Sequence, residues 1–421
     1  MTARHRPAEL PTPPRWREVA AATGLLAADG TVRATIFAEM SALAARTGAI
    51  NLGQGFPDVD GPASVVAAAQ RALGSGANQY PPGPGIPELR TAVAAHQARH
   101  YGLAVDPDRE VLVTAGATEA IAAAVLALAG PSDEVLTLEP FYDSYAAVIA
   151  MAGARHTTVP LVATPDGFRV DVDALAAAFT HRTRVVLLNT PHNPTGAVLT
   201  SAELEAVARL AVEHDAVVVT DEVYEHLTLA RTGGVRPEHV PVATLPGMAG
   251  RTLTISSAGK TFSFTGWKVG WVTGPEELVV AVRTVKQFLT YVSAAPLQPA
   301  VAFALDDPGV AAWVDELAAS LAARRDLLCA GLADAGFGVA RPDGTYFVLA
   351  DAAPLGFADG AELCHALPGL AGVVGIPVSA FTRPGSDVDR ALRSWVRFTF
   401  VKRDDVLAEA VERLHRWAAR R

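Results

Sequence analysis

The stretch that decides the fold of this chain is Thr252–Lys268, with the sequence TLTISSAGKTFSFTGWK. Its first residues, Thr252–Ile255, form a short apolar run that is typical of a buried β-strand. Small residues then lead to a single lysine, Lys260, which aromatic and hydroxyl residues follow. A lysine in such surroundings is partly desolvated, which favours the neutral amine over the ammonium ion. Because the neutral amine attacks carbonyl groups to form a Schiff base, the stretch predicts a reactive lysine at a strand end.

Two other strand-like runs end in polar residues and strengthen this interpretation. An isolated Ser-x-x-Lys pattern would be better explained by a surface lysine after a strand. Here, however, the β-branched run 216–220 is followed by DEVY (221–224), and the run 184–188 is followed by NTPHNPTG (189–196). Asp221 and Asn193 therefore follow strand ends, as Lys260 does.

Together these stretches resemble the class I/II aminotransferases, which are fold-type-I pyridoxal-phosphate enzymes. The motif NLGQGFPD (51–58) adds to the resemblance, which extends from about Ile36 to Arg413. Within this family the chain is similar to the kynurenine, glutamine and methionine aminotransferase branch, and most of all to the bacterial N-succinyldiaminopimelate aminotransferases in that branch. The resemblance implies pyridoxal 5′-phosphate as the cofactor and Lys260 as the residue that holds it.

Composition argues against several other classes of protein. A chain of 421 residues, of which 50% are hydrophobic, can bury a large core and is long enough for two or three domains. Its net charge of −9 and the lack of a basic stripe argue against nucleic acid and anionic membranes as partners. Cys329 and Cys364 lack metal-ligand spacing, so we expect buried thiols in a reducing cytoplasm, no metal and no required disulfide.

The N-terminal region contains one apolar stretch, residues 19–28. Its length approaches that of the hydrophobic segment of a signal peptide, but it contains Thr23 and Gly24 and follows a Pro-rich lead. We therefore expect a flexible arm and no export signal. The longest apolar run, 120–130, is too short for a bilayer core of about 30 Å. A soluble, cytoplasmic protein is the expectation.

Between residues 111 and 273, short β-branched runs alternate with Ala- and Leu-rich helical stretches. This alternation predicts an α/β fold, a mostly parallel sheet with helices on both faces. The resemblance implies seven strands with the last antiparallel, and seven candidates are present: Val111–Thr114, Glu134–Leu138, His156–Val159, Arg184–Leu188, Ala216–Thr220, Thr252–Ile255 and Val269–Thr273.

After about Pro299 the pattern changes to that of a smaller α+β domain. A long amphipathic helix is expected over 313–332, strands over 345–350 and 396–400, and a terminal helix over 404–420. We therefore predict a large cofactor-binding domain (51–299) and a small C-terminal domain (300–421). The resemblance assigns residues 1–50, an N-terminal arm, partly to the small domain.

Polar residues follow the last apolar residue of five predicted strands. These clusters are 115–118, 139–142, 189–193, 221–224 and 256–260. Because open α/β sheets bind ligands outside the carboxyl ends of their strands, the five clusters predict one shared site.

The resemblance gives several of these residues a role toward the ring of the cofactor. Asp221, which otherwise reads as a helix cap, pairs with the pyridine nitrogen and keeps it protonated, which makes the ring an electron sink. Tyr224 and Asn193 reach the phenolic oxygen, and Asn189 belongs to the same group of cofactor-binding residues. Tyr142 stacks on the ring, although an aromatic residue after a strand also suits a core position.

The phosphate group of the cofactor needs hydrogen-bond donors. Thr118 and Ala117 precede the helical run 119–129, whose N-terminus offers free amides and a favourable dipole. By resemblance Ser257 adds a hydroxyl and Lys268 a charge, where many relatives have arginine. A surface lysine on a strand edge is the alternative for Lys268. Tyr80 matches a tyrosine that reaches the phosphate of a neighbouring subunit, which implies a homodimer.

Arg397 lies in the alternating run VRFTF (396–400), so it faces away from Val396 and Phe398. An exposed arginine on a strand is the default explanation. The resemblance instead makes it the fork that binds the substrate α-carboxylate with two parallel hydrogen bonds. Gly55, which has no side chain, allows backbone to approach the same carboxylate.

One departure from the family motif and one predicted substrate entrance remain. His192 replaces the asparagine common in the Asn-Asn-Pro motif, and we expect it to affect packing and not chemistry. Tyrosines and hydrophobic residues over 287–296 are expected to line the substrate entrance.

The sequence thus predicts a ping-pong aminotransferase in which Lys260, Asp221 and Tyr224 are the catalytic residues. Its substrates are amino acids and 2-oxo acids, with glutamate and 2-oxoglutarate as one pair. The resemblance favours N-succinyl-L,L-diaminopimelate as the amino-acid substrate, in lysine and diaminopimelate biosynthesis. A broad glutamine, methionine or kynurenine aminotransferase with cysteine-conjugate β-lyase activity is the alternative. An effector-binding domain of a transcription regulator is disfavoured, because the roughly 50 residues before Asn51 are too few for a DNA-binding domain.

Overall fold

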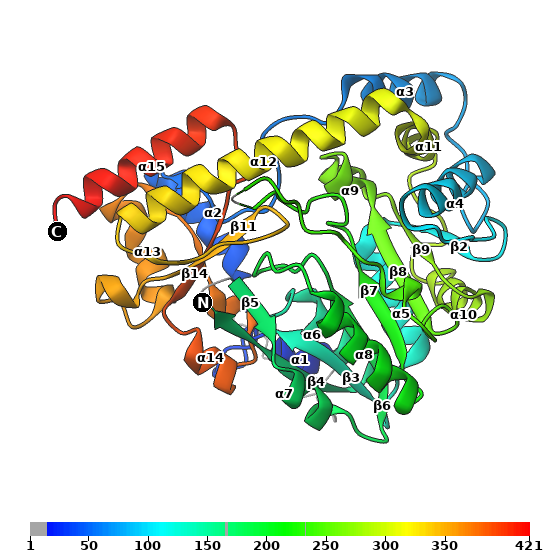
Figure 1. The fold of residues 1–421 in the computed structure, drawn as a ribbon, viewed down its shortest axis with the longest axis horizontal. Coiled ribbons are helices and arrows are strands. Elements are labelled where there is room, and N and C mark those ends of the chain that lie inside the picture. Colours follow the sequence, from blue (N-terminus) through cyan, green and yellow to red (C-terminus); the bar gives the residue numbers. More distant parts are fainter. Residues whose placement is uncertain (1–14, 165–166, 232) are drawn as a thin grey trace, which may run out of the picture.

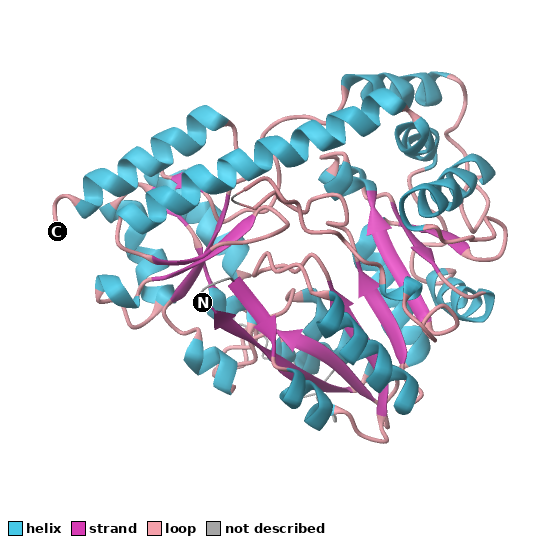
Figure 2. Ribbon diagram, viewed as in Figure 1, coloured by secondary structure: helices cyan, strands magenta, loops and turns pink. Residues whose placement is uncertain are grey.

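The computed structural model describes residues 15–164, 167–231 and 233–421. Its centre is a mostly parallel sheet of eight strands in the order β2-β9-β8-β7-β6-β3-β4-β5 (Figures 1 and 2). The strands are β2 (Val111–Thr114), β3 (Glu134–Glu139), β4 (Arg155–Thr164), β5 (Gly167–Val170), β6 (Thr183–Asn189), β7 (Val217–Asp221), β8 (Thr252–Ser257) and β9 (Gly270–Thr273).

All seven predicted strands are present, which confirms the α/β fold class. β9, the last of them, runs antiparallel to both of its neighbours, β2 and β8. β5 is an additional strand that the sequence analysis does not predict. It pairs antiparallel with the second half of β4 and forms one edge of the sheet.

Helices cover both faces of the sheet because its strands are apolar on both sides. Along β7, Val217 and Val219 pack into one hydrophobic cluster and Val218 into another. The first cluster includes α5 (Gly116–Leu128), α6 (Ser144–Ala152) and α10 (Glu276–Lys286), and the second includes α7 (Val172–Ala178) and α8 (Ser201–Glu213). α8 begins with a capping box, in which Thr200 Oγ1 and Glu203 Oε2 each accept a hydrogen bond from the other residue's backbone N–H.

Three helices pack beside β2 and β9 at the other edge of the sheet. They are α3 (Ala63–Gly74), α4 (Pro87–Tyr101) and α11 (Gln298–Asp306), and they enclose the buried Trp271 of β9. The long helix α12 (Pro308–Asp334) runs from this group to the C-terminal helix α15 (Asp404–Ala418), as Figure 1 shows.

A second, smaller sheet has the order β10-β11-β14-β13, with every pair antiparallel. Its strands are β10 (Gly338–Ala340), β11 (Phe347–Asp351), β13 (Ile376–Pro377) and β14 (Trp395–Thr399), and α13 (Gly360–Leu370) and α14 (Asp387–Ala391) belong to the same region. The expected α+β character of this region, its two predicted strands and both predicted helices are confirmed.

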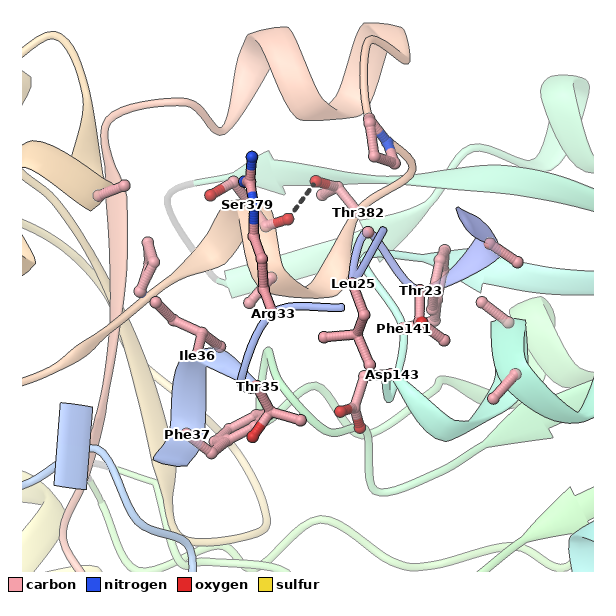
Figure 3. Close-up of a pocket in the computed structure, with 18 of the residues that line it drawn as sticks. Thr23, Leu25, Arg33, Thr35, Ile36, Phe37, Phe141, Asp143, Ser379 and Thr382 are labelled. Carbon is pink, nitrogen blue, oxygen red and sulfur yellow. Dashed lines mark hydrogen bonds between the residues drawn. The ribbon is translucent and has the colours of Figure 1, made fainter. Parts of the chain in front are cut away.

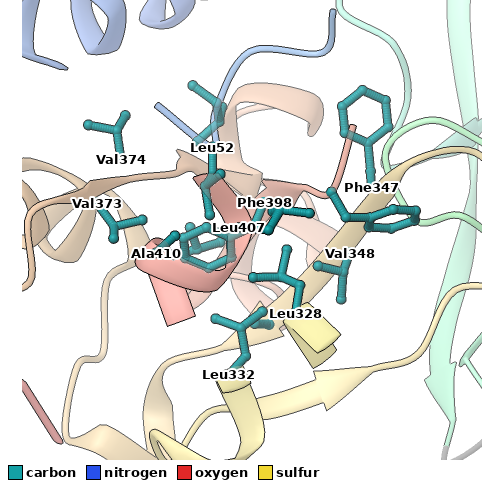
Figure 4. Packing of buried hydrophobic residues seen from close by; sticks show 14 of the residues in the cluster. Leu52, Leu328, Leu332, Phe347, Val348, Val373, Val374, Phe398, Leu407 and Ala410 are labelled. Carbon is teal, nitrogen blue, oxygen red and sulfur yellow. The ribbon is translucent and has the colours of Figure 1, made fainter. Parts of the chain in front are cut away.

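The N-terminal and C-terminal parts of the chain share one core. α2 (Ile36–Thr47) contacts α13, and β1 (Ile50–Asn51) pairs with β12 (Val373–Val374) in parallel. Leu52 packs with Leu328, Phe398 and Leu407 in the cluster that Figure 4 shows. This packing agrees with the assignment of residues before 51 to the smaller domain, although the domain boundaries themselves stay predictions.

The expectation of a flexible N-terminal arm is wrong for the residues that the structure describes. Residues 15–22 form helix α1 (Arg15–Ala22), which lies against α6 and buries Ala20. Alanine has the highest helix propensity of all residues, and contact with α6 gives this short helix the tertiary support that it needs. Residues 1–14, the Pro-rich lead, lie outside the described residues.

Two other expectations concern the cysteines and the membrane. Cys329 and Cys364 are buried free thiols on α12 and α13, as predicted. Burial raises the pKa of the Cys329 thiol to about 12. Within the described ranges, the helices include none that combines the length and the apolar character needed to cross a bilayer.

Candidate active site

A cavity of about 170 Å³ lies at the carboxyl ends of the central strands. All five polar clusters contribute to its wall, so the prediction that they converge is confirmed. The lining residues are Gly116, Ala117, Thr118, Ile121, Tyr142, Asn193, Asp221, Val223, Tyr224, Ser257, Gly259, Lys260, Thr265, Lys268 and Val269.

The register of three neighbouring strands brings these clusters together. Asn189 of β6 lies beside Asp221 of β7, which lies beside Ile255 of β8. The Asn189 amide donates a hydrogen bond to the Asp221 carbonyl (2.7 Å), and its side-chain oxygen accepts one from the Asn193 backbone N–H (2.7 Å). Asn189 itself does not line the cavity. Its predicted contact with the cofactor stays a prediction, and its observed contacts position Asp221 and Asn193.

Asp221 is a buried carboxylate in the wall of the cavity. Its Oδ2 accepts a hydrogen bond from the Tyr145 hydroxyl (2.7 Å), and its Oδ1 accepts one from the Val223 N–H (3.4 Å). Burial raises the pKa of Asp221 to about 6, although both hydrogen bonds and nearby Lys260 act to lower it. Sequence reasoning missed Tyr145, because a tyrosine in the apolar helix SYAAVIAMA looks like an ordinary core residue.

Lys260 lies on the one-turn helix α9 (Ala258–Thr261) that follows β8. Its Nζ donates a hydrogen bond to the Tyr346 hydroxyl (3.0 Å), which in turn donates to the Gly55 carbonyl (2.7 Å). The amine also lies 5.7 Å from the ring centre of Tyr224 and 5.6 Å from that of Tyr346. Tyr346 was not predicted, since it precedes β11 in the smaller domain, far from Lys260 in sequence.

Backbone amides and a positive charge lie near the N-terminus of α5. Gly116 and Ala117 begin this helix, and a Cβ added at Gly270 would lie 2.7 Å from the Gly116 carbonyl carbon. Only glycine at position 270 therefore lets β9 approach the helix N-terminus so closely. Lys268 lies beside Gly116 and remains partly exposed to solvent. Burial, and then the charge of Lys260, lower the pKa of Lys268.

Arg397 is buried, with only 3% of its surface exposed, so the default explanation of an exposed arginine is wrong. Its guanidinium lies over the rings of Phe347 (4.0 Å) and Phe381 (4.5 Å). Nη1 donates to Asn193 Oδ1 (3.0 Å) and Nη2 to the Gly53 carbonyl (3.0 Å), while Nε is buried without a partner among the described residues. Burial lowers the pKa of Arg397 to about 10, so the group stays cationic at neutral pH.

Position 55 must be glycine because of the nearby ring of Phe347, over which the Arg397 guanidinium lies. A Cβ at this position would lie 2.5 Å from Cζ of Phe347. The missing side chain thus leaves room for Phe347, and the Gly55 carbonyl accepts the Tyr346 hydrogen bond.

Comparison with known proteins agrees with this geometry. The family model described as aminotransferase class I and II matches residues 47–414, most of the chain. The chain belongs to this family. Like its relatives, this aminotransferase depends on pyridoxal 5′-phosphate and acts on amino acids and 2-oxo acids.

Two relatives of the aminotransferase are similar over nearly their whole length. A probable N-succinyldiaminopimelate aminotransferase, DapC, of Mycobacterium tuberculosis is 57% identical over 90% of this chain and 95% of its own. A methionine aminotransferase of Escherichia coli is 39% identical over 90% and 95%. Among solved structures, N-succinyldiaminopimelate aminotransferase from M. tuberculosis gives a TM-score of 0.87 (57% identity, 91% of this chain and 97% of that one). Aspartate aminotransferase from Thermus thermophilus with maleate gives 0.82 (35% identity, 91% and 95%).

The cavity of the aminotransferase contains the types of group that its cofactor needs. Its wall includes a carboxylate (Asp221), a primary amine (Lys260) and an aromatic ring (Tyr142). It also includes Thr118 and Ser257, the start of α5 and Lys268. Burial, and then Asp143 and Asp221, raise the pKa of Tyr142 to about 12, so its hydroxyl stays neutral.

Other predicted residues lie outside this cavity. Tyr80 is 80% exposed, and its ring meets Tyr291 edge-on at 5.4 Å. The segment 287–296 lines neither of the cavities described here, so its role at the entrance stays a prediction. His192 is buried, and its Nδ1 lies 2.8 Å from Thr195 Oγ1, in agreement with a packing role.

A second, outer cavity of about 560 Å³ shares Tyr142 with the first. It is enclosed by the segment 22–39, by the start of α6 and by residues 377–393. Figure 3 shows Arg33 reaching past Ser379 on one side, with Asp143 and Phe37 at the other end. Phe37 also lies under the Arg397 guanidinium (5.5 Å), so the outer cavity adjoins the predicted binding site of the α-carboxylate.

Proposed function

We propose that this aminotransferase acts on N-succinyl-L,L-diaminopimelate, with glutamate and 2-oxoglutarate as the second pair. The observation that carries this proposal is the 57% identity, over nearly the whole of both chains, to the M. tuberculosis enzyme named for that substrate. The outer cavity supports it, because a long substrate with a distal carboxylate needs space and a cation beyond the reacting carbon. The exposed guanidinium of Arg33 suits such a carboxylate.

The chain's own residues divide the chemistry among them. Pyridoxal 5′-phosphate, when bound, supplies an electron sink for the electrons released at the substrate α-carbon. Lys260 holds the cofactor covalently and then moves the proton at the α-carbon as general acid and base. Asp221 holds a proton on the pyridine nitrogen, and Tyr145 holds Asp221 in place. Tyr224 and Asn193 donate hydrogen bonds to the phenolic oxygen.

The phosphate and carboxylate groups are held by separate sets of residues. Thr118, Ser257, Lys268 and the amides of Ala117 and its neighbours bind the phosphate. Arg397 binds the substrate α-carboxylate. Its Nε has no partner among the described residues, so this N–H can donate a hydrogen bond to that carboxylate. Lysine at 268 is a point charge, so the α5 amides orient the phosphate.

We also propose a cytoplasmic homodimer in which Tyr80 reaches the phosphate in the neighbouring subunit. The 80% exposure of Tyr80 in the single chain supports this, because the side chain is free to enter another subunit.

A broad-specificity enzyme is the second candidate, favoured by the 39% identity to a methionine aminotransferase and 38% to a rat kynurenine–oxoglutarate transaminase. The test is kcat/KM for N-succinyl-L,L-diaminopimelate against methionine, glutamine and kynurenine, each with 2-oxoglutarate. We expect the succinylated diacid to be preferred by at least about 100-fold, since a distal ion pair and added contacts provide roughly 3 kcal/mol. Equal or better rates with the neutral amino acids would make the broad-specificity enzyme the correct assignment.

A further inference from the structure

Three histidines form a cluster outside the cofactor cavity, between α4 and the segment after β7. His96 and His100 lie one turn apart on α4, and His226 comes from the segment after β7. The ring centres are 4.5 Å apart for His96 and His100, and 5.0 Å apart for each of these with His226. One ring nitrogen of each residue lies within 4.8 Å of the other two. The rings therefore form a nearly equilateral triangle whose nitrogens converge.

The spacing of the nitrogens suits a metal ion of ordinary size. Nε2 of His96 and Nε2 of His226 are 2.7 Å apart, so one donates a hydrogen bond to the other. A tetrahedral ion with metal–nitrogen bonds of about 2.05 Å separates its ligand nitrogens by about 3.4 Å. An ion can therefore replace the shared proton after the two rings separate by roughly 0.7 Å. Histidines four residues apart on a helix, such as His96 and His100, also present both rings on one face.

The histidines are in the protonation state that metal binding needs. Burial lowers the pKa of His96 to about 3 and that of His226 to about 4, and it also lowers the pKa of His100. All three imidazoles are therefore neutral near pH 7 and offer a lone pair.

A buried carboxylate beside the cluster favours a cation. Glu225 accepts a hydrogen bond from the Tyr101 hydroxyl (2.6 Å) and another from Ser256 Oγ. Both hydrogen bonds favour the charged form of the Glu225 carboxylate, which attracts positive charge toward the three rings.

Two arginines near the cluster oppose this attraction. Arg99 and Arg236 act to lower the pKa of the neighbouring histidines. Both guanidinium groups are turned to other acceptors, Arg99 to the Leu305 carbonyl and Arg236 to Thr228 and the His226 carbonyl. The negative charge of Glu225 acts in the opposite sense on both His96 and His226.

We propose that His96, His100 and His226 bind one divalent transition metal ion of the zinc class, with water as the fourth ligand. Imidazole nitrogens select such ions over magnesium and calcium, which prefer oxygen. His100 is exposed, so the ion enters from solvent. The ion joins α4 to the segment after β7. Glu225 follows Tyr224 in the sequence and accepts a hydrogen bond from Ser256. The ion therefore also stiffens the strand ends that carry the cofactor residues.

The test uses the holoenzyme, prepared without a histidine tag, freed of metal with a chelator and of unbound cofactor by dialysis. Zinc is titrated calorimetrically, and cobalt by the visible bands of a tetrahedral ion. We expect one ion per chain and a thermal midpoint at least roughly 2 °C higher at saturating zinc. No saturable uptake up to about 100 µM zinc, far above the range of structural sites, would overturn the proposal.

Two matched variants locate the ion. His100→Ala removes an exposed ligand without opening the core, and we expect at least a 10-fold loss of zinc affinity together with loss of the cobalt bands. His181→Ala, at an exposed histidine that does not belong to the cluster, should leave both signals unchanged. Equal affinity in the wild type and His100→Ala, or an equal loss in His181→Ala, would contradict binding at the cluster.

Discussion

The cofactor cavity and the outer cavity share Tyr142 but are built in different ways. The inner one encloses about 170 Å³ and is lined by residues that follow hydrogen-bonded strands. The outer one encloses about 560 Å³, and its wall comes largely from the segments 22–39 and 377–393. Strand register fixes the relative positions of the inner groups, whereas the outer wall includes exposed side chains such as Arg33. Under the proposed function, this difference separates two tasks, the chemistry in the inner cavity and the choice of substrate at the outer one.

Removal of the Lys260 amine should have the largest effect of the changes described here. This effect should be confined to the chemistry of the inner cavity. We expect Lys260→Ala to lower kcat by at least about 10⁴-fold, because the group serves both as nucleophile and as proton carrier. The visible absorbance of the bound cofactor should change as well. Stopped-flow and steady-state assays on folded protein, checked by circular dichroism, provide the measurement. Transamination at an undiminished rate would refute the assignment of Lys260.

Arg397 contacts a residue of each cavity, Asn193 of the inner one and Phe37 of the outer one, and we expect it to affect substrate more than cofactor. Arg397→Ala should raise KM for every amino acid by about 100-fold, since removing one partner of a buried, hydrogen-bonded charge pair costs roughly 3 kcal/mol. Cofactor affinity, measured by equilibrium dialysis, should change less than about 3-fold. Arg397→Lys keeps the charge without the planar fork and should recover only part of the loss. Equal losses of substrate and cofactor binding would instead indicate a structural role.

Burial of the Asp221 carboxylate in the inner cavity lowers the stability of the folded, cofactor-free protein at neutral pH. Its pKa is raised from 3.8 in the unfolded chain to about 6 in the folded, cofactor-free protein. The folded state therefore binds the proton more tightly, so the contribution of this group to stability falls as pH rises from about 4 to about 6. Above pH 6 the buried charge is a constant penalty on the order of 3 kcal/mol.

Asp221→Asn should thus stabilise the cofactor-free protein at pH 8, even though it abolishes the charge that the cofactor needs. The gain in thermal midpoint should shrink toward zero near pH 4. Tyr145→Phe, which removes a hydrogen bond to the same carboxylate but keeps the charge, serves as the control. A midpoint of Asp221→Asn that follows the wild type at every pH would contradict this account.

The smallest expected effect tests the outer cavity. Arg33→Ala should lower kcat/KM for N-succinyl-L,L-diaminopimelate by about 5-fold, because an exposed ion pair contributes at most roughly 1 kcal/mol. The rate with methionine, which lacks a distal carboxylate, should not change. Arg283→Ala, an exposed arginine of α10 that lines neither cavity, is the matched control. A loss of the same size with both substrates would remove Arg33 from substrate selection.

The residues that line the inner cavity as the sequence predicted share one property, which is that each lies a few residues from the end of a strand or the start of a helix. Asp221, Asn193 and Lys260 each follow a strand by a few residues, and parallel strands present their carboxyl ends at one edge. Their convergence could therefore be predicted without knowing the strand order. Ala117, Thr118 and Ser257 were predictable for the same reason, as neighbours of a strand end or a helix start.

The residues that sequence reasoning missed depend on contacts between distant segments. Tyr346 lies 86 residues from Lys260, and Tyr145 lies 76 from Asp221. A buried tyrosine gives no local sign of which polar group its hydroxyl will meet. The histidine cluster is similar, because 130 residues separate His96 from His226. The helical arm α1 was misjudged since its order depends on contact with α6.

The sequence by itself determined the α/β fold, the family and the chemistry, because β-branched runs, strand-end polar residues and the lysine motif act through local periodicity. The tertiary structure alone decided that Arg397 is buried on two aromatic rings, that Asp221 is held by Tyr145, and that an outer cavity adjoins the site. These features depend on how far-separated side chains exclude water from one another. Burial of that kind turns an ordinary arginine or aspartate into a group with a displaced pKa, and local sequence does not record it.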